Sequence, residues 1–231
     1  MAERVRDVRA RIATAAREAG RSVDSVTIVG ASKSQPVSSI ESLARLGITH
    51  FGENYVQEGL AKMGALAAEP LTWHFIGHIQ ANKTRAIAEH FAWVHGIDRL
   101  RLAERLSAQR PFHAPPLNVC IEVNLAGEAR KAGAAPADVP ALAAAVAALP
   151  RLTLRGLMAL PPEEPTLVGQ RRCFGELRTL FESLNARGAR LDTLSMGMSA
   201  DVEAAVLEGA TLVRVGTALF GPRPVREPPD A

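Results

Sequence analysis

The sequence predicts an α/β protein, a single TIM-like (β/α)8 barrel with an additional N-terminal helix. Eight short apolar segments rich in β-branched residues alternate with longer segments of helical spacing. Parallel strands need right-handed helical crossovers between them, and eight such units close naturally into a barrel. The 231 residues fit one such barrel, and we see no linker or second domain.

The elements follow one another in a regular order. The expected strands cover residues 26–32, 48–52, 71–77, 91–96, 117–124, 152–160, 193–197 and 211–220. The expected helices cover residues 3–19, 38–46, 54–67, 80–90, 99–109, 137–148, 168–187 and 200–208. In the helix at 168–187, apolar residues recur at spacings of three and four, which is the period of an amphipathic helix.

The two ends of the chain complete this barrel. No helix is expected after the eighth strand, so the N-terminal helix is expected to fill that place in the outer ring. Ser38 with Glu41 three residues later predicts a capping box for the helix at 38–46. We expect residues 1–221 to form the barrel and residues 222–231, with four prolines in ten residues, to form an irregular tail. An open doubly wound sheet is the alternative, because periodicity does not separate the two.

Composition narrows the classes of function. The net charge of +3 comes from 27 basic and 24 acidic residues that are scattered along the chain, so we expect no nucleic-acid partner. No apolar run has membrane-spanning length and the N-terminus lacks a signal peptide, which predicts a cytoplasmic protein without a membrane partner. Cys120 and Cys173 form no CxxC pair, so we interpret them as free thiols.

The first candidate site residue is Lys33, which leaves the first apolar strand. In a barrel, functional groups gather at the carboxyl ends of the strands. Desolvation or a nearby cation would lower the pKa of such a lysine, and the neutral amine can then attack an aldehyde to form a Schiff base. The alternative is a solvated lysine at a strand end.

Two further candidates follow the last two strands. At Ser199 a strand passes through a glycine turn into a helix, where backbone N–H groups and a hydroxyl attract phosphate. Alternatively, Ser199 only caps that helix. Arg214 lies within an apolar strand and needs a partner, either a ligand or a structural salt bridge. Gly216 allows close backbone approach and Thr217 adds a hydroxyl.

Other chemistries have no support in the sequence. There is no P-loop, no GxGxxG and no nucleophile elbow. His78 and His95 do not have metal-ligand spacing, and there is no HExxH or carboxylate cluster, so we expect no metal site. His74, which stands alone in its strand, is interpreted as a structural residue in a barrel layer or at the interface between strand and helix.

Six stretches of the chain resemble one known family. They occur in the family's order and cover the chain from about residue 26 to residue 221: residues 29–36 (VGASKSQP), 51–58 (FGENYVQE), 73–83 (WHFIGHIQANK), 155–158 (RGLM), 194–203 (LSMGMSADVE) and 213–221 (VRVGTALFG). Together they resemble the pyridoxal phosphate homeostasis protein family, which is similar in fold to the barrel domain of alanine racemases. His78 and Ile79 depart from residues that the family often has before Gln80.

The resemblance implies a pyridoxal 5′-phosphate (PLP) site. By that resemblance Lys33 carries PLP as a Schiff base and Arg214 faces the pyridine nitrogen. Ser199, with the backbone and hydroxyl groups of Gly216 and Thr217, holds the phosphate. Asn54 lines the pocket near the ring.

The resemblance also implies a carrier rather than an enzyme. An arginine beside the pyridine nitrogen disfavours its protonation and makes the ring a weaker electron sink. Racemases add a tyrosine base from a second domain, whereas the one tyrosine here, Tyr55, begins an expected helix. We therefore expect no catalytic residue and a role in vitamin B6 homeostasis, with PLP buffered and delivered to PLP-dependent apoenzymes.

Three points stay open at this stage. One alternative is a PLP-dependent amino acid racemase with weak activity, and another is a Schiff-base aldolase that works without PLP. The racemases' second domain contributes their dimer interface, and we expect no such domain here, so the expected state is a monomer.

Overall fold

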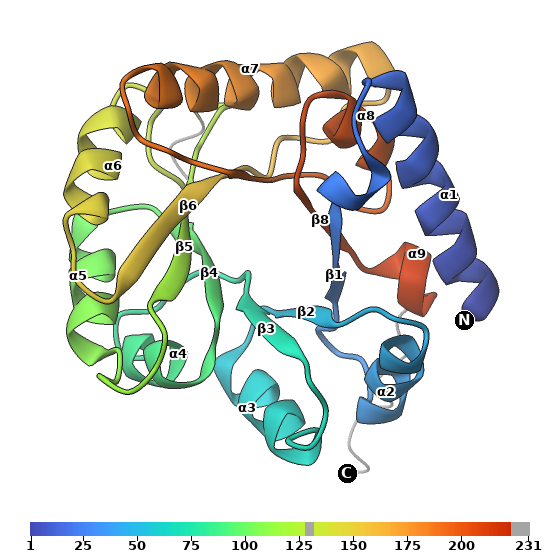
Figure 1. Ribbon diagram of the computed structural model, residues 1–231, viewed down its shortest axis with the longest axis horizontal. Coiled ribbons are helices and arrows are strands. Elements are labelled where there is room, and N and C mark those ends of the chain that lie inside the picture. Colours follow the sequence, from blue (N-terminus) through green and yellow to red (C-terminus); the bar gives the residue numbers. More distant parts are fainter. Residues whose placement is uncertain (128–131, 223–231) are drawn as a thin grey trace, which may run out of the picture.

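The computed structural model describes residues 1–127 and 132–222 and forms a closed barrel of parallel strands (Figure 1). The strands are hydrogen-bonded in chain order, and the first pairs with the last. They are β1 (Thr27–Ala31), β2 (His50–Glu53), β3 (Thr72–Phe75), β4 (Trp93–Ile97), β5 (Leu117–Glu122), β6 (Leu152–Met158), β7 (Thr193–Ser195) and β8 (Leu212–Val215). The predicted barrel is confirmed, and the open doubly wound sheet is wrong.

Helices surround the barrel as an outer ring (Figure 1). They are α1 (Ala2–Glu18), α2 (Val37–Arg45), α3 (Val56–Ala65), α4 (Thr84–His90), α5 (Leu100–Gln109), α6 (Val139–Ala147), α7 (Leu167–Ala186), α8 (Val202–Leu207) and α9 (Thr217–Phe220), with a 3-10 turn η1 (Val23–Ser25) before β1. Strands such as β4 are buried along their whole length, because both faces of a parallel barrel are covered.

The last part of the barrel differs from the prediction. A short helix, α9, follows β8, whereas no helix was expected there. The apolar run continues past Gly216, but Leu219 and Phe220 both donate their amides to the Gly216 carbonyl and form a helical turn. The N-terminal helix α1 packs against α8 and α9 and so lies in the outer ring, as predicted (Figure 1). Arg4 fixes this position by donating to the Leu219 carbonyl at 3.0 Å.

The predicted capping box at Ser38 is wrong. Helix α2 begins at Val37, and Pro36 with an extended backbone is its N-cap. Proline has a fixed φ and no N–H, which suits a helix start. Ser38 therefore lies inside the first turn, where its carbonyl accepts a hydrogen bond from the Ser42 hydroxyl at 2.8 Å. The predicted irregular tail at 222–231 lies outside the described residues except for Pro222.

Gly156 in β6 lies in close contact with the backbone of β7. A Cβ added at Gly156 would lie 1.7 Å from the Thr193 carbonyl oxygen of β7. Since that oxygen belongs to the backbone, the two strands would have to separate. We expect Gly156→Ala to lower the free energy of unfolding by about 3 kcal/mol, measured by urea denaturation.

Gly64 provides the matched control for this prediction. It lies in α3, and nothing is within 4 Å of an added Cβ. Alanine is a better helix former than glycine, so Gly64→Ala should stabilise the protein by up to about 1 kcal/mol. Equal changes in the free energy of unfolding for Gly156→Ala and Gly64→Ala would contradict the tight contact between β6 and β7.

Within the described ranges, no helix is both long and apolar enough to span a bilayer.

Candidate functional site

Four neighbouring strands bring the predicted site residues to one face of the barrel. Lys33 follows β1, Asn54 follows β2, Ser199 follows β7, and Gly216 and Thr217 follow β8. Strand β1 pairs with both β2 and β8, and β8 pairs with β7. Because the carboxyl ends of parallel strands share one face of a barrel, these residues lie on adjacent loops of the mouth.

Lys33 is half-buried in the turn directly after β1. Its amine makes no hydrogen bond or ion pair with any residue that the structure describes. Helix α3 holds the backbone on both sides of it: Lys62 Nζ donates to the Ser32 carbonyl at 2.6 Å, and the Ser34 amide donates to Glu58 Oε1 at 2.5 Å. Ser34 has a φ of 62°, which is uncommon for a residue with a side chain. The turn is thus fixed while the Lys33 amine stays unengaged.

The support beneath this turn is an ionic cluster of buried Lys62 and Glu53 with half-buried Glu58, here called the Lys62 cluster. Lys62 Nζ lies 2.7 Å from Glu53 Oε1 and 2.7 Å from Glu58 Oε1. The Ser32 hydroxyl donates to Glu53 Oε1 at 2.6 Å, whereas Glu53 Oε2 has no hydrogen-bond partner in the described structure. Burial raises the pKa of Glu53, although the hydrogen bonds from Lys62 and Ser32 oppose this.

Sequence reasoning missed the Lys62 cluster, but a signal for it was present. Val56, Gly59 and Lys62 recur at a spacing of three on the buried face of α3. A lysine on the apolar face of a helix needs a buried partner. Glu53, which precedes the helix at the end of β2, is that partner.

The structure brings Ser199 together with the residues after β8. The Ala218 amide, in the first turn of α9, donates to Ser199 Oγ at 3.2 Å. Ser199 does not cap α8, whose N-cap is Asp201. Gly216 lies against the end of β1, because its added Cβ would be 3.7 Å from the Ala31 carbonyl. The Ser199 hydroxyl, the start of α9 and the end of β1 therefore adjoin one another.

Asp201 and Glu203, the acidic residues after Ser199, both accept hydrogen bonds from other parts of the protein. Asp201 Oδ1 accepts from the Met198 amide at 2.6 Å. Glu203 accepts from Arg11 Nε of α1 at 2.5 Å, and Arg11 also donates to the Ser199 carbonyl at 3.0 Å. Contact with Arg11 lowers the pKa of Glu203. Glu203 would therefore repel a phosphate near Ser199 only weakly, since its charge is paired with that of Arg11.

Arg214 is buried in β8 without a salt bridge to any described residue. Its Nη1 donates to the carbonyl and the hydroxyl of Ser195, both at 2.6 Å, and Nη2 donates to the Ala159 carbonyl at 2.9 Å. Burial lowers the pKa of Arg214 to about 10, while the charges of Asp201 and Glu122 oppose this. Arg214 therefore stays cationic at neutral pH, and the interpretation of Arg214 as half of a structural salt bridge is wrong.

A cavity of about 490 Å³ opens at the mouth between the loops after β2, β3 and β6. Asn54, His78 and Glu122 line it, whereas Lys33 does not. Gly77 touches the backbone of Asn54, since an added Cβ would lie 2.3 Å from the Asn54 carbonyl oxygen. Burial, together with the charge of Asp98, raises the pKa of Glu122 to about 6.

Beneath the mouth, His74 and His95 are fully buried in the barrel interior. His74 Nδ1 lies 2.9 Å from His95 Nε2, and His95 Nδ1 lies 2.7 Å from Ser195 Oγ across the barrel. Of the two places expected for His74, the barrel layer is confirmed. Burial, and then the charge of Arg214, lowers the pKa of His95 to about 3. Both imidazoles are therefore neutral near pH 7.

The buried histidines predict acid sensitivity. In the unfolded chain His95 binds a proton below about pH 6.5, whereas in the fold it stays neutral, so stability is lost as the pH falls. Between about pH 7 and pH 5 the wild type should lose about 2 kcal/mol more than His95→Gln, in urea denaturation at each pH. His113→Gln, at an exposed position, should behave as the wild type. Parallel pH profiles for wild type and His95→Gln would contradict a neutral His95.

Other residues singled out in the sequence lie apart from this arrangement. Tyr55 is 63% exposed at the start of α3. Cys120 and Cys173 are free thiols, and burial raises the pKa of Cys120 to about 12. Among the residues with described positions, no group of histidine, cysteine and carboxylate side chains could hold a metal ion.

Comparison with known proteins first defines the class of domain. The family model of the alanine racemase N-terminal domain matches residues 7–224. The alanine racemase of Clostridium difficile 630 in complex with cycloserine shares the fold, with a TM-score of 0.75 at 14% identity. The match covers 95% of this chain and 61% of that one.

Closer relatives then define the family. The pyridoxal phosphate homeostasis proteins of Pseudomonas aeruginosa and Escherichia coli K12 are 55% and 48% identical to this chain, and each match covers 96% of it and 96% or 97% of the relative. PipY of Synechococcus elongatus, in structures without and with PLP bound, aligns with TM-scores of 0.85 and 0.83 at 38% and 37% identity. These matches cover 96% and 95% of this chain, and 100% and 99% of PipY. The chain belongs to the pyridoxal phosphate homeostasis protein family.

Proposed function

We propose that this protein binds PLP at the barrel mouth, with the aldehyde joined to the Lys33 amine as a Schiff base, and that it acts in intracellular PLP homeostasis. The observation that carries the proposal is that an unengaged lysine, a serine hydroxyl and a buried arginine lie on three adjacent strands or the loops after them. The names of the relatives and the PLP-bound structure of PipY support it.

Each residue would contribute a separate interaction. The Ser199 hydroxyl, with the backbone N–H groups at Gly216 and Thr217, would hold the phosphate, as helix starts do for anions. Arg214 would face the pyridine nitrogen, and its lasting charge would disfavour protonation of that nitrogen. Asn54, which lines the mouth cavity, would contact the ring. PLP itself supplies a reactive aldehyde and a conjugated ring.

Arg214 and Ser199 fit the ring nitrogen and the phosphate of PLP. Arg214 is cationic and its described hydrogen-bond partners are all neutral, so it can donate a further hydrogen bond to an electron-rich group such as an unprotonated ring nitrogen. The Ser199 hydroxyl already lies beside the first turn of α9.

We further infer a carrier without catalytic residues. A cationic Arg214 would make the bound ring a poor electron sink, and Tyr55 is too exposed to serve as a positioned base. A weak racemase is the second candidate, because Glu122 lines the mouth with a pKa raised to about 6, close to the range of a general acid or base.

Chiral analysis separates the two candidates. The PLP-loaded protein would be incubated with single amino acids, with free PLP and the Lys33→Ala variant as controls. We expect interconversion no faster than with free PLP. Steady turnover well above that level would contradict the carrier, and its loss in Glu122→Gln would assign a racemase base. The visible absorption band of bound PLP separates both from a Schiff-base aldolase, which is colourless.

The remaining expectations are part of the same proposal. Residues 1–221 would act as one domain, monomeric and cytoplasmic, and would deliver PLP to PLP-dependent apoenzymes. Light scattering tests the monomer. Delivery is tested with a PLP-dependent enzyme from which PLP has been removed. The PLP-loaded protein should activate this enzyme faster than the PLP that it releases into buffer does.

A further inference from the structure

Five polar side chains form a continuous hydrogen-bonded chain through the barrel interior, here called the histidine chain. His50 Nδ1 lies 2.9 Å from His74 Nε2, and His74 Nδ1 lies 2.9 Å from His95 Nε2. His95 Nδ1 lies 2.7 Å from Ser195 Oγ, which accepts from Arg214 Nη1 at 2.6 Å. The five residues come from β2, β3, β4, β7 and β8. The chain therefore joins the first residue of β2, at the amino-terminal face, to Arg214 below the mouth.

The three histidines are neutral near pH 7. Burial lowers the pKa of His50, and it lowers the pKa of His74 much further. Burial, and then the charge of Arg214, lowers the pKa of His95 to about 3. A neutral imidazole has one N–H donor and one acceptor nitrogen, so each contact requires neighbouring tautomers to match.

Arg214 sets the direction of the chain, because a guanidinium only donates. If Ser195 donates its proton to His95 Nδ1, then His95 and His74 each donate from Nε2 to the next Nδ1, and every group between Arg214 and His50 Nδ1 is paired. In the opposite direction His95 donates to Ser195, and the fully buried hydroxyl proton finds no acceptor among the described residues. An unpaired buried donor is costly. All three histidines should therefore carry their proton on Nε2.

We propose that the histidine chain positions Arg214 for the cofactor and conveys the protonation state of His50 to it; this rests on the proposed function. A proton added at His50 Nδ1 would face the donor Nε2 of His74. The pair would then hold two donors and no acceptor, so the whole chain would have to reverse. After this reversal His95 donates to Ser195 Oγ, so the Ser195 hydroxyl proton has to point away from His95. The hydroxyl that Arg214 contacts is thereby disturbed.

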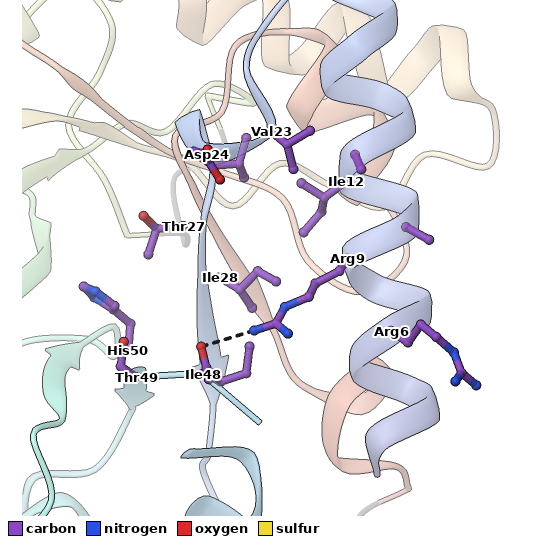
Figure 2. A pocket seen from close by; sticks show the side chains of 14 residues that line it. Arg6, Arg9, Ile12, Val23, Asp24, Thr27, Ile28, Ile48, Thr49 and His50 are labelled. Carbon is purple, nitrogen blue, oxygen red and sulfur yellow. Dashed lines mark hydrogen bonds between the residues drawn. The ribbon is translucent and has the colours of Figure 1, made fainter. Parts of the chain in front are cut away.

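His50 is the end of the chain that can take up a proton. It is half-buried and borders a cavity of about 760 Å³ at the amino-terminal face, between α1 and β1 (Figure 2). The charged residues lining this cavity are Arg6, Arg9 and Asp24. Arg9 donates to the Gly47 carbonyl at 3.2 Å, and Arg6 points away into solvent in Figure 2. From β3, His50 is faced by neutral His74.

The first test needs no cofactor. In protein with ¹⁵N-labelled histidine, nuclear magnetic resonance distinguishes the two neutral tautomers, and single histidine variants assign the signals. We expect the Nε2–H form for His50, His74 and His95 at about pH 7.5, where each imidazole is neutral. An Nδ1–H form at His74 or His95 would overturn the direction of the chain.

The second test breaks the chain away from the mouth. His74→Leu removes the middle link of the histidine chain. Trp93→Leu removes the ring that stacks on His74, with ring centroids 5.4 Å apart, and leaves the histidine chain intact. We expect His74→Leu to weaken PLP binding about fivefold and to flatten the change in PLP affinity across the titration of His50. Trp93→Leu should keep the wild-type affinity and pH profile.

The outcomes separate the two proposals. If His74→Leu and Trp93→Leu have the same PLP affinity as each other and the same pH profile, the positioning role is overturned. Failure of the wild type to bind PLP at Lys33 would overturn the proposed function instead, and the tautomer measurement would still decide the direction of the chain.

Discussion

Replacement of Lys33 by alanine should abolish the visible absorption of bound PLP and weaken PLP binding by at least about a hundredfold. The variant keeps Arg214, Ser199 and the start of α9, so residual binding through the ring and the phosphate is expected. The covalent link is lost, because the Lys62 amine beneath this turn is buried and bonded to Glu53, Glu58 and the Ser32 carbonyl. Absorbance titration with PLP measures both effects.

Lys83 provides the control for this substitution. It lies on the same face of the barrel and lines a second cavity with Asn54 and Gly77. Lys83→Ala should bind PLP as the wild type does. Unchanged colour and affinity in Lys33→Ala, or their loss in Lys83→Ala, would move the site from the end of β1 to the loop after β3.

The second large effect is expected at Lys62. Lys62→Met preserves the length of the side chain but leaves the Glu53 carboxylate buried without its cation. Breaking a buried ion pair in this way costs about 3–5 kcal/mol, which urea denaturation measures. The turn that carries Lys33 loses the bond to the Ser32 carbonyl as well, so PLP affinity should fall with stability.

A double variant separates charge from packing. Adding Glu53→Gln to Lys62→Met removes the uncompensated carboxylate, so most of the lost stability should return. The pH provides a second check. Burial raises the pKa of Glu53, so Glu53 binds a proton more readily in the folded Lys62→Met variant than in the unfolded chain. The loss of stability of this variant relative to the wild type should therefore shrink as the pH falls. A deficit that is independent of pH and not restored by Glu53→Gln would indicate lost packing alone.

The fold was predictable because the signals that define it are local. Each strand is a short β-branched run, and parallel connections admit few arrangements. The loops after β1, β7 and β8 were predictable for the same reason, since the carboxyl end of a strand locates a residue at the mouth of a barrel. Lys33, Ser199 and Gly216 could therefore be placed before the structure was known.

The polar interior was not predictable. His50, His74, His95 and Ser195 contact one another across the barrel, and their partners depend on strand register, which periodicity does not fix. Only His74 was interpreted as a structural residue, and its partners on other strands were not anticipated. The helix after β8 was missed for a related reason. A run of apolar residues fits a strand or a buried helix equally well, and only the turn at Gly216 decides.

Borohydride reduction of the PLP-loaded protein, followed by peptide mass mapping, tests the assignment of Lys33 most directly. Reduction makes the link between cofactor and amine permanent, so the modified lysine can be read from the peptides. We expect the phosphopyridoxyl mass on the peptide that contains Lys33. Its absence there, with the same mass on a peptide containing Lys62 or Lys83, would contradict the assignment.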